Sequence, residues 1–161
     1  MLDISSWTWG LILIVFTTGI HSFGIVLLSL LGVRIRDYLK SRGPHFWQAI
    51  GLLTMGIAVV GLSLAVLHGV EAALWAGAYL SLGALDTPAE AMLFSIDSMT
   101  TRGASGLTPH QHWQVMGALE AVAGMLMFGI STAYMFFVMQ LNWSEIQARR
   151  DAEALNLSSQ T

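Results

Sequence analysis

The sequence predicts an all-helical membrane protein with three transmembrane helices and one short re-entrant helix. Of its 161 residues, 55% are hydrophobic and only 11% are charged, and the mean hydropathy is +0.64. Soluble domains carry about 25% charged residues, so this balance favours lipid as the solvent. Three uncharged stretches, residues 10–33, 49–67 and 121–141, are each long enough to cross the ~30 Å hydrocarbon core of a bilayer.

The first span and the charged residues predict the orientation. The N-terminal Met-Leu-Asp lacks the positive region of a secretory signal, so we expect the first span to be retained. Basic residues follow the first and third spans: Arg34, Arg36, Lys40, Arg42, Arg149 and Arg150. The positive-inside rule makes both clusters cytoplasmic and the N-terminus external, with Trp7 and Trp9 in the outer interfacial belt. With three crossings, the ends of the first and third spans lie on the same side of the membrane, which agrees with the positions of the two basic clusters. We expect the membrane to be a bacterial inner membrane.

Turn signals divide the rest of the chain. Gly43 and Pro44 break the chain before a second span begins near Phe46, and this helix is predicted to continue through residue 85. Asp86-Thr87-Pro88 then predicts a new helix, with Asp86 or Thr87 as its cap, which runs over residues 89–99. The expected domains are an extra N-terminal helix with its basic loop (1–45), a pore domain (46–141) and a short polar helical tail that frays (142–161).

The helix over residues 89–99 is too short to span and leads into the glycine-rich stretch "SMTTRGASGLTP" (98–109). A short helix followed by irregular backbone between two spans predicts a re-entrant loop. Such backbone is tolerated at membrane depth only where protein buries it or where it lines a water-filled cavity. Three spans enclose no cavity alone, so we expect a homotetramer assembled around this loop.

The stretch "FSIDSMTTRGASGLTP" resembles the potassium-channel pattern of a pore helix followed by T-T-V-G-Y-G-D and a Thr-Pro exit. The matching positions are Thr100, Thr101, Gly103, Thr108 and Pro109. The stretches "HGVEAALWAGAYLSLGALDTPAEAMLFS" and "GALEAVAGMLMFGISTAYMF" also resemble small bacterial members of the two-transmembrane potassium-channel family. The resemblance covers about residues 49–139. It implies an outer helix, a pore helix, a filter over residues 100–106 and an inner helix.

The filter departs from that pattern at four positions. Arg102, Ala104, Ser105 and Gly106 stand where the family has Val, Tyr, Gly and Asp. Potassium filters replace the hydration shell of the ion with backbone carbonyls. Ser105 would adopt the conformation of the missing glycine only at a cost. The resemblance therefore implies a pore architecture more strongly than potassium selectivity, and weakly selective passage of monovalent cations is expected.

Arg102 has three interpretations. Four arginines facing the axis of a tetramer about 8 Å apart would repel one another by roughly 2 kcal/mol per pair at an effective dielectric of ~20, and such a ring would exclude cations. The resemblance instead directs this side chain toward the pore helix, where Asp97 lies five residues earlier and would form an ion pair behind the filter. In the third interpretation, Arg102 is simply an exposed residue at the mouth of the pore. The ion pair is the favoured interpretation.

Three residues at helical spacing, His68, Glu71 and Trp75, share one face of the second span. His and Glu both bind zinc, so a metal or proton-sensing pair is one interpretation. Two ligands are too few for a site, so we favour a polar clasp that holds this helix against the pore helix or a neighbouring subunit. No metal and no cofactor are expected. His21, within the first span, is expected to hydrogen-bond to a neighbouring helix as a neutral imidazole.

Polar residues at the start of the third span are also ambiguous. His110 and His112 would lie at the external mouth, either as a pH or divalent-ion sensor or, as we favour, as solvated interface groups. Glu120 is interpreted either as a buried, hydrogen-bonded carboxylate near the pore helix or as a group that attracts cations. The sequence does not separate these two roles.

Small residues follow along the same span. Gly117, Ala121 and Gly124 form a stripe that permits close approach of another helix. Gly129 is a candidate bend or gate, with ordinary packing of the inner helix as the alternative.

Several function classes are excluded. The sequence has no phosphate-binding loop followed by Lys, no nucleophile elbow and no basic stripe beyond the topology signals, so neither an enzyme nor a nucleic-acid partner is expected. The expected function is a tetrameric passive ion channel. The alternatives are an anion-selective pore with an axial Arg102 ring and a non-conducting structural or sensory membrane subunit.

Overall fold

The computed structural model describes residues 4–42 and 46–158, and these residues are almost entirely helical. The helices are α1 (Ile4–Arg42), α2 (Phe46–Ser81), α3 (Pro88–Met99), a short 3-10 helix η1 (Gln111–Trp113) and α4 (Gln114–Ser158). No strand occurs in the described ranges. The predicted break at Gly43 and Pro44 lies outside the described residues.

Three of these helices are long and apolar enough to cross a membrane: α1 over Ile4–Asp37, α2 over Ile50–Ser81 and α4 over Gln114–Ala148. Few residues of these helices are buried within the single chain. In the most apolar window of α2, for example, only 6% of the residues are buried. A soluble helix that is apolar on all sides would instead be enclosed by protein. The prediction of an all-helical chain with three helices able to span a membrane is therefore confirmed.

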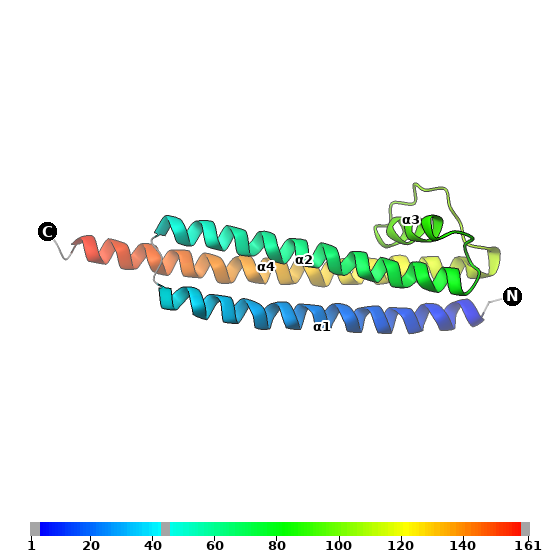
Figure 1. Cartoon of the computed structure of the whole chain (residues 1–161), viewed down its shortest axis with the longest axis horizontal. Coiled ribbons are helices and arrows are strands. Elements are labelled where there is room, and N and C mark those ends of the chain that lie inside the picture. The colour runs from blue at the N-terminus through cyan, green and yellow to red at the C-terminus, as the bar shows by residue number, and fades with distance from the viewer. Residues whose placement is uncertain (1–3, 43–45, 159–161) are drawn as a thin grey trace. The chain divides into compact units, whose positions relative to one another are not determined.

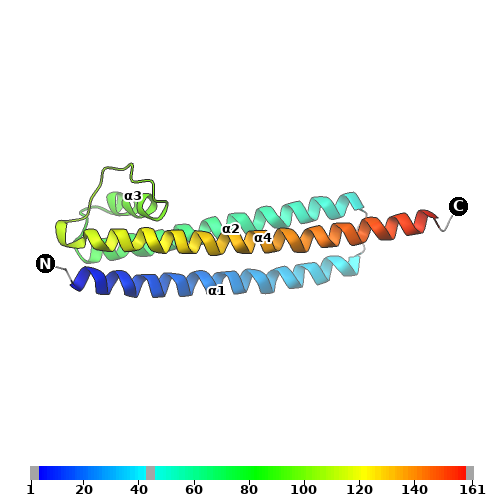
Figure 2. The same cartoon turned by 180° about the vertical axis from the view of Figure 1, so that it is seen from behind.

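Contacts divide the chain into two compact units. The first comprises Met1–Gly24 and Ala65–Ile130, and the second comprises Ile25–Leu64 and Ser131–Thr161. Within the first unit, α3 lies on the opposite side of α2 and α4 from α1 in both views (Figures 1 and 2). Its core is built around Trp75, Tyr79, Met116 and Met127. The second unit contains the remaining lengths of α1, α2 and α4.

The helix α3 begins as the sequence predicts. Thr87 is the N-cap, and its side chain accepts a hydrogen bond from the Glu90 N–H at 3.2 Å. Pro88 occupies the first turn, where its missing N–H costs nothing. The cap is therefore Thr87 rather than Asp86.

The helix α2 ends four residues earlier than predicted, at Ser81. Gly83 has φ +63, and its N–H donates to the Leu80 carbonyl, while the Ala84 N–H donates to the Tyr79 carbonyl. This pair of bonds is the Schellman motif, which satisfies the last carbonyls of a helix and needs the left-handed conformation that glycine adopts readily. The tail is helical, as predicted, but it is not a separate helix, because α4 continues through it to Ser158.

Candidate functional site

Hydroxyl groups fix α3 to the two helices beside it. The Ser95 hydroxyl lies 2.8 Å from the Ala72 carbonyl of α2 and also contacts the Glu120 carboxylate of α4. Because this hydroxyl carries one proton, it donates to one of the two at a time. The Ser98 hydroxyl donates to the Gly117 carbonyl at 2.8 Å. The C-terminal half of the short helix is thus joined to α4 at two positions.

Glu120 is fully buried and joins three helices. Its carboxylate accepts a hydrogen bond from the Tyr79 hydroxyl at 2.8 Å and contacts the Ser95 hydroxyl. This is the buried, hydrogen-bonded carboxylate that was one of the two interpretations from sequence. A role in attracting cations stays a prediction.

Tyr79→Phe should lower the free energy of unfolding by about 1 kcal/mol, because it removes one net hydrogen bond and keeps the ring. The ring should still meet Phe94 edge-on, at 5.2 Å between centroids. Thermal unfolding in detergent measures the change. Tyr134→Phe is the control, since its hydroxyl takes no part in this network, and an equal loss in both variants would contradict the assignment.

The predicted small-residue stripe provides the contact between α3 and α4. A Cβ on Gly117 would lie 2.9 Å from Phe94 Cζ, and one on Gly124 would lie 2.7 Å from Met99 Cα. Ala121 lines the pocket between these two contacts. Gly129 differs, because among the described residues nothing lies within 4 Å of the position that an added Cβ would take. Its role as a gate stays a prediction.

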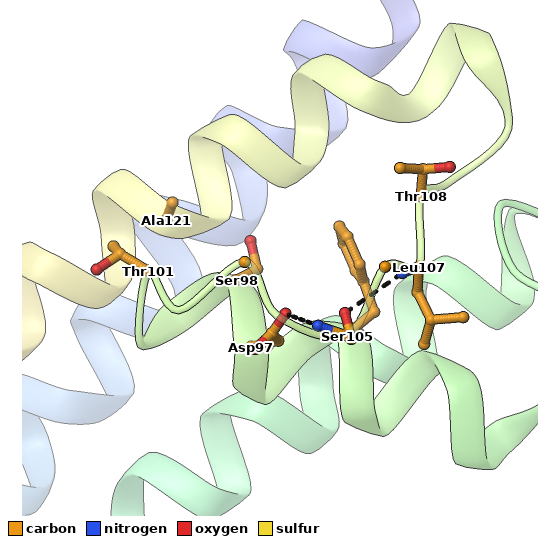
Figure 3. A pocket seen from close by; sticks show the side chains of 10 residues that line it. Asp97, Ser98, Thr101, Ser105, Leu107, Thr108 and Ala121 are labelled. Atoms are coloured by element: carbon orange, nitrogen blue, oxygen red, sulfur yellow. Dashed lines mark hydrogen bonds between the residues drawn. The ribbon is translucent and has the colours of Figure 1, made fainter.

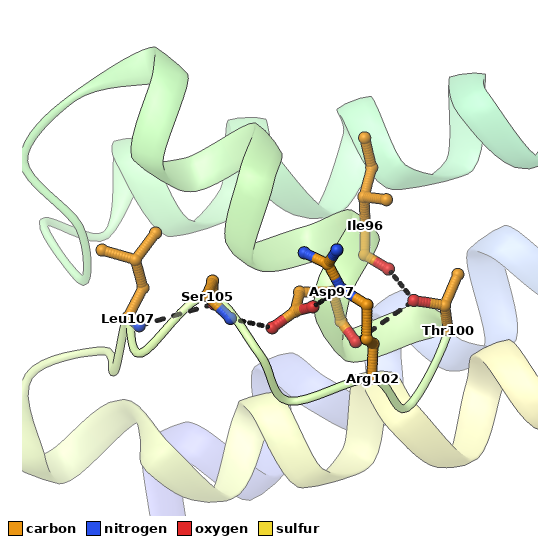
Figure 4. A network of polar contacts seen from close by, with 6 residues as sticks. All are labelled: Ile96, Asp97, Thr100, Arg102, Ser105 and Leu107. Atoms are coloured by element: carbon orange, nitrogen blue, oxygen red, sulfur yellow. Dashed lines mark hydrogen bonds and ion pairs between the residues drawn. The ribbon is translucent and has the colours of Figure 1, made fainter.

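The loop after α3 is held by the Asp97 carboxylate (Figure 4). Arg102 Nε donates to Asp97 Oδ1 at 2.6 Å, and the Ser105 N–H donates to Oδ2 at 2.8 Å. The Arg102 N–H also donates to the Asp97 carbonyl at 3.0 Å. The predicted ion pair is therefore present, and it turns the guanidinium back onto α3. The Arg102 side chain remains 59% exposed, whereas Asp97 is buried.

These contacts hold the pKa of Asp97 at about 2, below its ordinary 3.8, chiefly through the Arg102 hydrogen bond and then the Ser105 N–H. Because the folded-state pKa is the lower one, the pairing stabilises the fold fully above about pH 4. That contribution is lost as the pH falls from 3.8 towards 2.

The stability of Asp97→Asn should therefore depend less on acid than that of the wild type. We expect the variant to unfold at a lower temperature at neutral pH and the difference to shrink between about pH 4 and pH 2. Thermal unfolding in detergent across this range measures it. A difference that does not change with pH would show that the carboxylate charge is not what stabilises the loop.

The backbone of the loop turns at Thr101, Gly103 and Gly106, with φ of +54, +60 and +68. Thr101 is the only non-glycine residue with positive φ in the described ranges, a conformation that costs a β-branched residue of order 1–3 kcal/mol. Ser105 avoids the left-handed region, in agreement with the predicted cost of a glycine conformation at this position. Thr100 donates its hydroxyl to the Ile96 carbonyl at 2.7 Å and so extends the end of α3.

A pocket of about 480 Å³ lies between α3, this loop and Ala121 of α4 (Figure 3). Four hydroxyl-bearing residues line it: Ser98, Thr101, Ser105 and Thr108. The predicted filter residues Gly103 and Gly106 also line it, and Ala104 lies exposed beside them. The structure thus brings most of the predicted filter around one pocket.

The predicted clasp forms with a different partner. Glu71 Oε1 lies 2.8 Å from His21 Nδ1, and Glu71 Oε2 lies 3.2 Å from His68 Nδ1. Glu71 therefore joins α2 to α1 within the chain. The sequence predicted a clasp to the pore helix or to a neighbouring subunit; the contacts described for Glu71 do not include α3, and the contact with a neighbouring subunit stays a prediction. Trp75 is buried in the core, and its Nε1 has no hydrogen-bond partner within the described residues. His21 does contact a neighbouring helix, as predicted.

The two histidines before α4 lie apart from this cluster. His110 Nε2 is 3.6 Å from Asp86 Oδ1, and both side chains are exposed. The His110 N–H donates to the Ala84 carbonyl at 3.1 Å. His112 is exposed, with its ring 5.1 Å from the Trp113 ring. These positions agree with solvated interface groups.

No family model matches the chain, and neither a curated protein nor a solved structure matches it at a significant level.

Proposed function

We propose that this chain forms a homotetrameric, passive channel for monovalent cations, built as a degenerate relative of the two-transmembrane potassium-channel family. It would lie in a bacterial inner membrane with its N-terminus outside and its C-terminus in the cytoplasm. Lipid, the permeant ions and identical subunits are its partners. In this arrangement α3 is a re-entrant pore helix and residues 100–106 are the filter.

The Asp97–Arg102 ion pair is the observation that carries the proposal. In a channel for cations, an arginine beside the filter must have its charge balanced, because an unpaired ring would repel the permeant ion. Arg102 Nε contacts Asp97 Oδ1 at 2.6 Å, and the side chain is directed toward α3 (Figure 4). The loop then offers backbone carbonyls and the Thr101 hydroxyl to a partly dehydrated ion.

The attachment of α3 supports the same proposal. A filter must keep its geometry while ions pass, so its supporting helix has to be rigid. Buried contacts with α2 and α4 provide this, through Ser95, Ser98 and Glu120. The pocket beside the loop, lined in part by hydroxyl-bearing residues, fits irregular backbone that needs protein or water around it at membrane depth.

The exposure of Arg102 favours one second candidate, an anion-selective pore. Its side chain is 59% exposed, so the pair lies at the surface of the single chain. In a tetramer in which these arginines reach the axis, the same loop would attract anions.

Flux into liposomes tests the proposal. Purified protein is reconstituted, and uptake of potassium, sodium and chloride is followed separately, with protein-free liposomes and a large impermeant cation as controls. We expect uptake of both potassium and sodium. Uptake of chloride alone would support the anion pore, and no uptake in any salt would support a non-conducting subunit. Native mass spectrometry of the same sample should show four chains.

A further inference from the structure

We infer that His21, His68 and Glu71 form a binding site for a divalent transition-metal ion, with Zn²⁺ as the best fit. The two histidines and one carboxylate come from α1 and α2 within the first compact unit. The inference stands apart from ion conduction, because these residues contact neither the loop nor the Asp97–Arg102 pair in the contacts described for them. From the sequence, His68 and Glu71 were too few for a site; His21 supplies the third ligand.

The spacing of the ligand atoms fits a small ion. One nitrogen or oxygen from each of the three residues lies within 4.8 Å of the others. The closest separations are 2.8 Å for His21 Nδ1 to Glu71 Oε1 and 3.2 Å for His68 Nδ1 to Glu71 Oε2. A tetrahedral Zn²⁺ at about 2.0–2.2 Å from nitrogen and oxygen ligands holds them about 3.3 Å apart. Small side-chain movements would therefore complete the coordination.

Burial argues for a cation at this point. Glu71 and His21 are fully buried in helices apolar enough to span a membrane, where an uncompensated carboxylate is costly. The contact from His68 is close but not aligned as a hydrogen bond, so Glu71 Oε2 has no donor among the described residues. A divalent ion would satisfy this oxygen and balance the charge.

The chemistry of the donors selects the metal class. Imidazole nitrogen with one carboxylate oxygen suits Zn²⁺ and its neighbours, whereas Mg²⁺ and Ca²⁺ prefer all-oxygen sites. Three protein ligands leave a fourth position for water or another group. His68 is the partly exposed ligand, with 26% of its side chain accessible. The fourth coordination position would therefore face the same way as the exposed part of His68. Bound metal would join α1 to α2.

Metal titration of the whole chain tests the inference without measuring flux. The protein is purified without a polyhistidine tag, stripped with a chelator and titrated with Zn²⁺ against a chromophoric competitor near neutral pH. We expect one Zn²⁺ per chain and a higher unfolding temperature in its presence. Co²⁺ should give the intense visible absorption of a four-coordinate ion. Wild-type protein with no stoichiometric metal and no such spectrum would overturn the inference.

Variants then locate the site. His21→Ala, His68→Ala and Glu71→Gln should each weaken Zn²⁺ binding at least about a hundredfold, since loss of a direct ligand exceeds the loss of a supporting contact. The matched control is His110→Gln with His112→Gln, which leaves the cluster intact and should bind as wild type does. Unchanged binding in the three cluster variants, or loss in the control, would overturn the assignment. If His21→Ala fails to fold, the Co²⁺ spectrum of the wild type and the Glu71→Gln variant still decide.

Discussion

Gly124→Ala should detach α3 from α4 and reduce ion flux to background. A Cβ at this position would lie 2.7 Å from Met99 Cα and 2.8 Å from Met99 C, both backbone atoms at the end of α3. Backbone does not swing aside as a flexible side chain does, so α3 and the loop after it must move. Overpacking of this kind costs typically about 1–3 kcal/mol, which exceeds the ~1 kcal/mol that alanine gains over glycine within a helix.

Two glycines provide matched controls for that variant. Gly129 on α4 and Gly69 on α2 have nothing within 4 Å of an added Cβ among the described residues. Gly129→Ala and Gly69→Ala should therefore unfold at the same temperature as the wild type or slightly above it. Thermal unfolding is measured on all three variants, and liposome flux is compared between Gly124→Ala and Gly69→Ala. If Gly124→Ala behaves like its controls, α3 does not pack against α4 as described.

Asp97→Asn should reduce cation flux at least about tenfold. The variant removes the negative partner of Arg102 and one strong acceptor of the Ser105 N–H. Each unbalanced arginine about 8 Å from the ion would raise the barrier for a cation by roughly 2 kcal/mol at an effective dielectric of ~20, more than the ~1.4 kcal/mol that corresponds to a factor of ten. The rate of potassium uptake into liposomes measures the effect.

A double variant separates the effect of the Asp97 charge on the ion from its effect on the conformation of the loop. Asp97→Asn with Arg102→Leu removes both charges, so cation flux should recover in large part compared with Asp97→Asn alone. Equal loss in the single and the double variant would mean that the carboxylate acts by shaping the loop. A full loss in Arg102→Leu alone would show that the arginine itself is required.

The features that follow from local sequence were predictable. Uncharged apolar stretches of about 20 residues predict the three membrane spans, because such stretches are rare outside transmembrane helices. Thr87 and Pro88 fix the start of α3 through its own backbone. The Asp97–Arg102 pair spans five residues, so the end of one short helix is enough to bring the two together.

The features that were missed depend on contacts between distant segments. His21 and Glu71 are 50 residues apart, and their pairing follows from how α1 packs against α2. One signal was available: each is an ionisable group within a different apolar span, and such groups tend to pair. The early end of α2 was missed because the φ of Gly83 is part of a motif that only the backbone geometry makes visible. The positive φ of Thr101 was also missed; it turns the backbone so that the Arg102 N–H reaches the Asp97 carbonyl.

The reversal potential of reconstituted wild-type protein in a KCl gradient tests the central claim most directly. With Arg102 neutralised by Asp97, cations carry the current, and the dilute side should become positive relative to the concentrated side. A negative potential on the dilute side would mean that anions carry the current and that Arg102 faces the axis, which contradicts the account.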